Sequence, residues 1–381
     1  MTSSAESAGF VQPAYGSRSL GDVVPAIAVA LGLSAAIPGP TPTGLALPPA
    51  PAYVVLLVDG LGAELLGRYA YAAPYLSGLL AGQQAGTAGV PSTTATSLTS
   101  LGTGLTPGVH GLVGFTSRVP GTEQLLNALF WDKRIDPMEW QPHPTAFADL
   151  AATGAEVTVV NKREFASSGL TVAAHRGGQF VGADRVGERL AAAAAAARAR
   201  PSLTYVYEGD LDWTGHRYGV ASEQWLQQLS MVDAEAEQLR AALPSDARLV
   251  VVADHGMVDS PSDDRTDVDT HPELRDGLVL LGGEARLRHL YCAHGAVADV
   301  ATTWREHLGD RALVLTREEA IGRSWFGPTE PQVLPRLGDV IVACRGSHGV
   351  FSSVDFGYET TLIGLHGSLT PDEMLIPILV G

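Results

Sequence analysis

The sequence predicts an α/β fold, a three-layer α/β/α sandwich around a mostly parallel central sheet. Short apolar runs rich in β-branched residues alternate with helical patterns along the whole chain. These runs are apolar at nearly every position, which is typical of strands covered by helices on both faces. The chain has 381 residues, of which 45% are hydrophobic and 17% charged, so it can bury a large core.

The expected elements follow one another in a regular order. An amphipathic helix is expected near residues 20–31, and hydroxyl groups crowd a strand-to-helix junction between residues 90 and 104. Short strands are expected near 113–119, and from 266 to 345 the pattern loosens into shorter strands and helices. The main strands are expected at 52–58, 156–161, 203–208, 248–253 and 375–380, and the main helices at 63–80, 145–152, 184–200 and 223–243.

No break in composition is sharp enough to separate two domains. We expect residues 1–18 to form a flexible N-terminal lead and residues 19–381 to form one catalytic domain. Within it, residues 260–345 are expected to be an irregular insertion that forms the walls of a pocket.

Composition and charge limit the partners. The formal net charge is −16, which argues against a nucleic acid polymer as partner, because phosphate backbones need clustered Lys and Arg. An acidic enzyme can still act on a phosphate if bound cations invert the local field. We see no signal peptide and no stretch long enough to span a membrane, and we expect Cys292 and Cys344 to be reduced thiols. These features predict a cytoplasmic protein without a membrane partner.

Metal-ligand residue types recur where strands end. The apolar run 248–253 leads directly into Asp254 and His255, and the run 52–58 leads into Asp59. Asp212 and His216 follow a third strand and lie four residues apart, so one helical turn places them on one face. The carboxyl ends of strands in an open α/β sheet form the ligand crevice, so we expect an active site there.

Several of these residues also have ordinary structural interpretations. Asp59 could cap the following helix, and Asp212 with His216 could be a solvated pair. In the tail, His366 could simply bond its own turn, and His348 competes with it as a ligand.

Taken in order, the motifs resemble those of the alkaline phosphatase superfamily, and most closely its type I phosphodiesterase/nucleotide pyrophosphatase family. The resemblance covers roughly residues 50–381. It rests on Val58-Asp59-Gly60, Pro91-Ser-Thr-Thr94, Asp212-x-x-Gly-His216-x-x-Gly219, Asp254-His255-Gly256-Met257 and His366-Gly367.

The resemblance implies an alkaline-phosphatase-like fold and two divalent metal ions, with zinc the expected metal. Thr94 would be the nucleophile, although Thr93 and Thr96 are neighbouring hydroxyls, and the Ala95 amide and the Ser97 hydroxyl would hold the phosphoryl group. One ion would be bound by Asp59, Thr94, Asp254 and His255, and the other by Asp212, His216 and His366.

The implied activity is hydrolysis of a phosphate diester or phosphoanhydride through a covalent phosphothreonine. The substrate would be a small-molecule phosphate ester or a nucleotide. A phosphomonoesterase or a phosphonate hydrolase on the same two-metal site is the alternative. A phosphosugar mutase and a non-catalytic binding protein are further alternatives that the motifs favour less.

Overall fold

The computed structural model describes residues 9–39 and 41–381. Its centre is a six-stranded sheet with the order β18-β8-β1-β7-β5-β6. Every neighbouring pair is parallel except β18 with β8, so the predicted mostly parallel sheet is confirmed. The strands are β1 (Ala52–Val58), β5 (Glu156–Asn161), β6 (Gln179–Gly182), β7 (Ser202–Glu208), β8 (Ala247–Val252) and β18 (Ile378–Val380).

The register of three parallel strands brings the expected site to one edge of the sheet. β1 is buried at every position and lies between β7 and β8. Val58 is opposite Glu208, and Leu57 is opposite Val252, so the three strands end at nearly the same level. The segments that leave these strands therefore emerge side by side, which places the residues after β1, β7 and β8 in one crevice.

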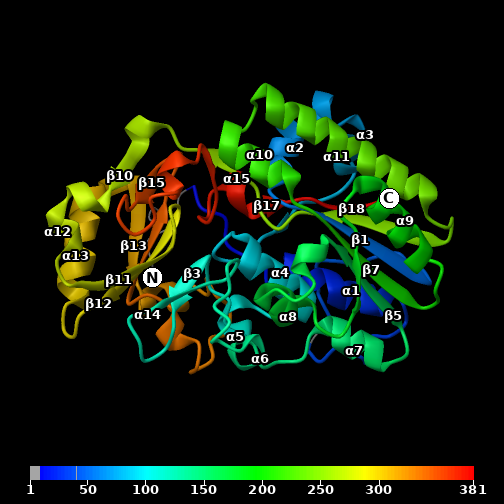
Figure 1. Cartoon of the computed structure of the whole chain (residues 1–381), viewed down its shortest axis with the longest axis horizontal. Helices are drawn as coiled ribbons and strands as arrows, with labels where there is room; N and C mark the ends of the chain where they lie inside the picture. The colour runs from blue at the N-terminus through cyan, green and yellow to red at the C-terminus, as the bar shows by residue number, and fades with distance from the viewer. Residues whose placement is uncertain (1–8, 40) are drawn as a thin grey trace.

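Helices cover both faces of this sheet (Figure 1). One layer consists of α2 (Ala63–Arg68), α3 (Pro74–Leu80), α9 (Val186–Ala196), α10 (Asp210–Tyr218) and α11 (Glu223–Ala242). The other consists of α1 (Val23–Ala30), α4 (Thr94–Thr103), α7 (Ala146–Ala152) and α8 (Gly169–His175), with the short helices α5 (Pro107–His110) and α6 (Pro137–Trp140) beside it. The predicted three-layer sandwich is therefore confirmed.

The helix expected over residues 63–80 is interrupted. It ends at Arg68, passes through a 3-10 turn at Ala70–Ala72, and restarts at Pro74 as α3. Proline has no backbone N–H to donate to the preceding turn, but it fits the first turn of a new helix. The proline therefore starts a helix here instead of continuing one.

Residues 265–361, called the cap below, form a second folded unit beside the sandwich (Figure 1). An antiparallel sheet with the order β11-β12-β14-β13 is packed against helices through its own buried cluster, which includes Leu290 and Trp304. Its elements are β11 (Leu278–Glu284), β12 (Leu287–Cys292), β13 (Ala312–Thr316), β14 (Val340–Cys344), α12 (Pro272–Arg275), α13 (Val297–Leu308) and α14 (Arg317–Gly322). The expectation of an irregular insertion at 260–345 is corrected: this region has regular secondary structure and a core.

Short strand pairs connect the remaining segments. The last helix, α15 (Pro371–Met374), precedes the strand that returns to the central sheet. The pairs are β2 (Gly86–Thr87) with β17 (Leu375–Ile376), β3 (Thr116–Arg118) with β4 (Leu125–Asn127), β9 (Val258–Asp259) with β16 (Gly364–Leu365), and β10 (Arg265–Asp267) with β15 (Gly349–Phe351).

The N-terminal segment departs from the expected flexible lead. The Val11 N–H donates to the Leu369 carbonyl at 2.8 Å. The Tyr15 hydroxyl donates to the Trp325 carbonyl at 2.9 Å and accepts the Val90 N–H at 3.0 Å. Residues 9–18 are thus bonded to the sandwich and the cap. The expected lead also included residues 1–8, which lie outside the described residues.

The helices and the cysteines add two further observations. Within the described residues, no helix is long and apolar enough to cross a membrane. Cys292 and Cys344 are free thiols on neighbouring strands of the cap.

Candidate active site

Six of the expected metal ligands converge at the edge of the sheet in two groups of three. Each residue of a group offers one ligand atom within 4.8 Å of the others. The first group follows β1 and β8, and the second combines α10 with the segment after β16. The groups are Asp59, Asp254 and His255, and Asp212, His216 and His366.

The first group has the spacing of ligands around an ion. His255 Nε2 lies 3.4 Å from Asp59 Oδ1 and 3.5 Å from Asp254 Oδ2. Ligands at zinc bond lengths in a tetrahedron lie about 3.3–3.4 Å apart, whereas N–H···O bonds are usually shorter. Asp59 Oδ1 and Asp254 Oδ2 are both buried without a hydrogen-bond partner. Buried carboxylate oxygens are costly unless something binds them, so this donor set fits a divalent cation.

The protein holds the other polar atoms of this group. Asp254 Oδ1 accepts the Gly60 and His255 N–H groups at 3.1 and 3.0 Å, and Asp59 Oδ2 accepts from the Tyr207 hydroxyl. His255 Nδ1 lies 2.9 Å from the Gly256 carbonyl, which fixes Nδ1 as the donor and leaves the Nε2 lone pair free. One oxygen of each carboxylate and one ring nitrogen therefore remain for a ligand.

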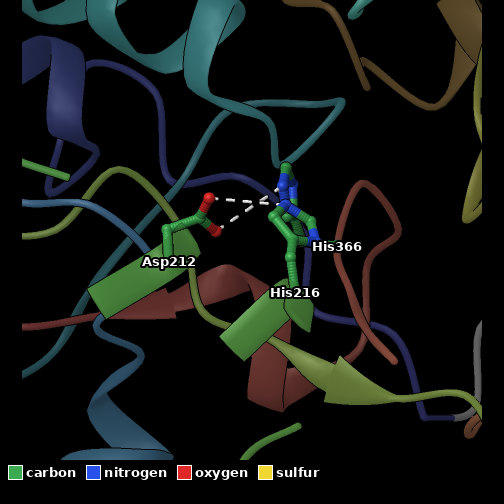
Figure 2. Close-up of side chains that lie close together, drawn as sticks. All are labelled: Asp212, His216 and His366. Carbon is green, nitrogen blue, oxygen red and sulfur yellow. Dashed lines mark ion pairs between the residues drawn. The ribbon is translucent and has the colours of Figure 1, made fainter. Parts of the chain in front are cut away.

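The second group repeats this arrangement (Figure 2), and its residues are less buried than those of the first. Asp212 Oδ2 lies 3.3 Å from His216 Nε2, and Asp212 Oδ1 lies 3.9 Å from His366 Nε2. His216 Nδ1 donates to the Gly364 carbonyl at 2.7 Å, and His366 Nδ1 donates to the Ser92 carbonyl at 3.0 Å. Both Nε2 lone pairs are thus available, and Asp212 Oδ1 is buried without a partner.

The two groups are adjacent. The rings of His255 and His366 are stacked with centroids 3.6 Å apart. Burial, together with the charges of Asp254 and Asp212, raises the pKa of Asp59 well above its usual value. Burial, with His255 and His216 nearby, lowers the pKa of His366 well below its usual value. The site therefore combines crowded carboxylates with a neutral imidazole, and bound cations would relieve the repulsion between the carboxylates.

Thr94 lies beside the first group. Its Oγ1 is 3.3 Å from His255 Nε2 and 3.5 Å from Asp59 Oδ2, and it is the first residue of α4. Thr96, a rival candidate, is fully buried and does not line the cavity at the site. Thr93 does line the cavity, but no contact places its hydroxyl beside either group of ligands. Of the three hydroxyls, that of Thr94 is the one in contact with the first group.

The chain matches the family model for type I phosphodiesterase / nucleotide pyrophosphatase over residues 53–368. It belongs to this family. The family consists of hydrolases that act on phosphoric ester bonds, and the chain is an enzyme of that class. The expected family is thereby confirmed.

Solved structures share the fold at low sequence identity. Murine ectonucleotide pyrophosphatase/phosphodiesterase 5 has a TM-score of 0.66 and 16% identity, with 86% of this chain and 87% of that chain covered. The inactive form of that enzyme in complex with AMP has a TM-score of 0.65 and 15% identity, with the same coverage. Phosphonoacetate hydrolase from Sinorhizobium meliloti, in complex with phosphonoformate, has a TM-score of 0.66 and 20% identity, with 87% of this chain and 90% of that chain covered. No curated protein matches the sequence.

The two expected phosphoryl-binding residues occupy different settings. Ser97 is fully buried, and its hydroxyl donates to the Asp254 carbonyl at 2.8 Å. Because a serine has only one proton to donate, Ser97 is corrected from a phosphoryl ligand to a support for the loop after β8. Ala95 is the second residue of α4, where backbone N–H groups point out of the helix end.

The competing histidine has a different role. His348 Nδ1 lies 2.9 Å from Asp264 Oδ1, just before the cap begins, and its Nε2 lies 3.2 Å from the Thr266 hydroxyl. It is in neither group of converging ligands. A third group on the cap surface, His271, Glu273 and His307, is more exposed and lies outside the cavity.

A cavity of about 830 Å³ opens over the site. Its walls include residues that the sequence did not single out, such as Phe115, Glu284 and Tyr358. Tyr207 was also missed. Phe115, Glu284 and Tyr358 come from segments without a motif, so only the folded chain could reveal them. Tyr207 directly precedes the Glu208–Asp212 segment, and this position could have drawn attention to it.

Proposed function

We propose that this enzyme is a metal-dependent phosphodiesterase with Thr94 as its nucleophile. The observation that carries the proposal is the position of Thr94 Oγ1 beside Asp59 and His255, next to a second group of ligands. Three carboxylates, three imidazoles and a hydroxyl form a nitrogen and oxygen donor set that suits two zinc ions. Asp59, Thr94, Asp254 and His255 would hold one ion, and Asp212, His216 and His366 the other.

The bound ions would supply Lewis-acid stabilisation of negative charge on the attacking, leaving and phosphoryl oxygens. The protein supplies the nucleophile and its orientation. Thr94 loses its proton to solvent, Oγ1 forms a bond to phosphorus, and the bond to the leaving oxygen breaks, so that an alcohol departs after taking up a proton. Water then attacks the phosphothreonine, which breaks the P–Oγ1 bond and restores the hydroxyl.

The N-terminus of α4 assists both steps in this proposal. Thr94 and Ala95 begin the helix, so the Ala95 N–H would be available to an oxygen of the phosphoryl group. Each step passes through a phosphorus centre with increased negative charge. The fixed dipoles of the helix end would favour that charge without reorganisation.

Two substitutions test the nucleophile. We expect Thr94→Ala to lower hydrolysis of bis-p-nitrophenyl phosphate by at least about 10³-fold, because the covalent route is lost. Thr96→Ala, the matched control, should keep the rate within about tenfold. Wild-type enzyme should cleave this diester faster than p-nitrophenyl phosphate. A Thr94→Ala enzyme with the wild-type rate, or a marked preference for the monoester, would refute the proposal.

Metal content gives a readout besides activity. We expect His366→Ala to reduce bound zinc by one ion per chain, and His348→Ala to leave it unchanged. Plasma mass spectrometry on dialysed protein measures both. Equal zinc in wild type and His366→Ala would contradict the assignment of the second group.

A further inference from the structure

Two histidines and a glutamate of the cap come together at a place that the proposed chemistry does not use. Glu273 Oε1 lies 3.2 Å from His307 Nδ1 and 3.6 Å from His271 Nδ1. The two imidazole rings meet edge to face, with centroids 4.4 Å apart and 68° between their planes. The three residues each offer one ligand atom within 4.8 Å of the others, and none of them lines the active-site cavity.

The separations within this group match those of ligands around a small cation. Two donors at zinc bond lengths in a tetrahedron lie about 3.3–3.4 Å apart. The two distances from Glu273 Oε1, 3.2 and 3.6 Å, lie on either side of that value. Two imidazole nitrogens and one carboxylate oxygen form a donor set that suits zinc and the neighbouring first-row divalent ions. The side chains of His271, Glu273 and His307 are 39%, 51% and 18% exposed, so water can complete the coordination.

The fold of the cap holds the backbones of these ligands in place. His271 and Glu273 lie at the start of α12, and His307 lies in the last turn of α13. The fully buried Trp304, one turn before His307, donates from Nε1 to the Leu274 carbonyl at 3.0 Å, which joins the two helices. The Leu274 N–H in turn donates to the His271 carbonyl at 2.9 Å. Binding of an ion would therefore need only small rotations of the three side chains.

The arginines beside this group have other partners. Arg275, which ends α12, pairs with Asp269 and Asp355. Arg311 follows α13, and its guanidinium donates to two carbonyls of the last turn of that helix. These two guanidinium groups are thus engaged away from the Glu273 carboxylate, and a divalent cation between the imidazoles would offset its charge.

The group lies at the open end of a β-hairpin. In element order α12 directly precedes β11, and α13 directly follows β12. These two strands pair antiparallel, with Leu278 opposite Cys292 at the end nearer the helices. At the other end, Glu284 and Ala285 line the active-site cavity. A cation bound by all three residues would therefore link the two ends of the hairpin on the side away from the cavity.

We propose that His271, Glu273 and His307 form a third metal site, which binds a divalent transition-metal ion such as zinc and links α12 to α13. The role of the ion is structural: its bonds to both helices restrain the ends of the hairpin, and its binding free energy adds to the stability of the cap. The site is separate from the two groups at the edge of the central sheet, and it does not depend on the proposed hydrolase function.

Zinc counting tests the site directly. Wild type and variants are stripped with a chelator, dialysed against one buffered concentration of free zinc and measured by plasma mass spectrometry. We expect His307→Ala and His271→Ala each to hold one zinc ion fewer per chain than wild type. His294→Ala removes another exposed histidine of the cap and should hold as much zinc as wild type.

The ligands at the edge of the central sheet are unchanged in all of these variants, so a difference in zinc reports on the cap alone. Equal zinc in wild type and His307→Ala would overturn the proposal. So would an equal loss of zinc in His294→Ala, because that loss would not be specific to the group.

Hydrogen exchange tests the link between the helices. With free zinc at about ten times the dissociation constant of the site, amides of α12 and α13 should exchange about tenfold more slowly in wild type than in His307→Ala. Without metal the two proteins should exchange alike, which separates the lost ligand from damage to the fold. Equal exchange of the two proteins in zinc would overturn the structural role of the ion.

Discussion

Gly256 follows His255 directly, and we predict that Gly256→Ala disables the site. A Cβ at this position would lie 1.9 Å from the Asp372 carbonyl oxygen and 2.8 Å from Gly62 Cα. Real Cβ contacts stay beyond 3.0 Å, so the loop after β8 and the Asp372 backbone would have to separate by about 1 Å. The backbone of Gly256 is not left-handed, so the conflict is steric rather than conformational.

The size of the effect follows from that displacement. Overpacking of a buried position costs about 1–3 kcal/mol, and both partners here are backbone, so we expect the upper part of that range. A shift of about 1 Å in Asp254 and His255 would lower kcat/KM by roughly 10²-fold. Urea denaturation measures the first effect, and p-nitrophenyl diester hydrolysis measures the second.

The matched control is Gly187→Ala in α9. A Cβ there would meet nothing within 4 Å, and alanine has the higher helix propensity, so stability should be unchanged or rise by up to about 1 kcal/mol. If Gly256→Ala kept both wild-type stability, within about 0.5 kcal/mol, and wild-type kcat/KM, the close packing of this loop would not be what positions the ligands.

Two further predictions concern the end of β7. Tyr207→Phe removes the hydroxyl that donates to Asp59, so zinc affinity should fall about 10- to 100-fold, as measured by chelator competition, with little change in fold. Burial raises the pKa of Glu208 to about 7 from an unfolded value of 4.5. Its stabilising contribution is therefore full below pH 4.5 and is lost as the pH rises through 7. Relative to Glu208→Gln, metal-free wild type should lose up to about 3 kcal/mol of unfolding free energy across that window, and parallel pH profiles would contradict this.

Local pattern was enough to predict five of the six strands of the central sheet and the order of the motifs, whereas β6 was not expected. A strand buried on both faces must be apolar at almost every position, as β1 and β8 are, so it can be recognised without its neighbours. The spacing of Asp212 and His216 likewise depends only on one helical turn, and α10 contains both residues. The carboxyl ends of parallel strands lie at one edge of the sheet. The strand directions alone therefore predicted that Asp59, Asp254 and Asp212 lie close together.

Choices between similar residues needed the folded chain. His348 and His366 have the same local sequence, His-Gly, and only their partners separate them: Asp264 for one, and the Ser92 carbonyl for the other. In the same way, Ser97 has the hydroxyl of a phosphoryl ligand but donates it to the Asp254 carbonyl. In each case the hydrogen-bond partner lies far away in the sequence.

The residues of the cavity walls could not be predicted from local sequence. Glu284 and Phe115 are 169 residues apart in the chain, and neither belongs to a motif. Their contact forms because the cap folds around its own core and presents the end of β11 to the site. Chemistry at the strand ends could be predicted because backbone geometry places those residues together. The residues that line the cavity could not be predicted, because their positions depend on long-range packing between the sandwich and the cap.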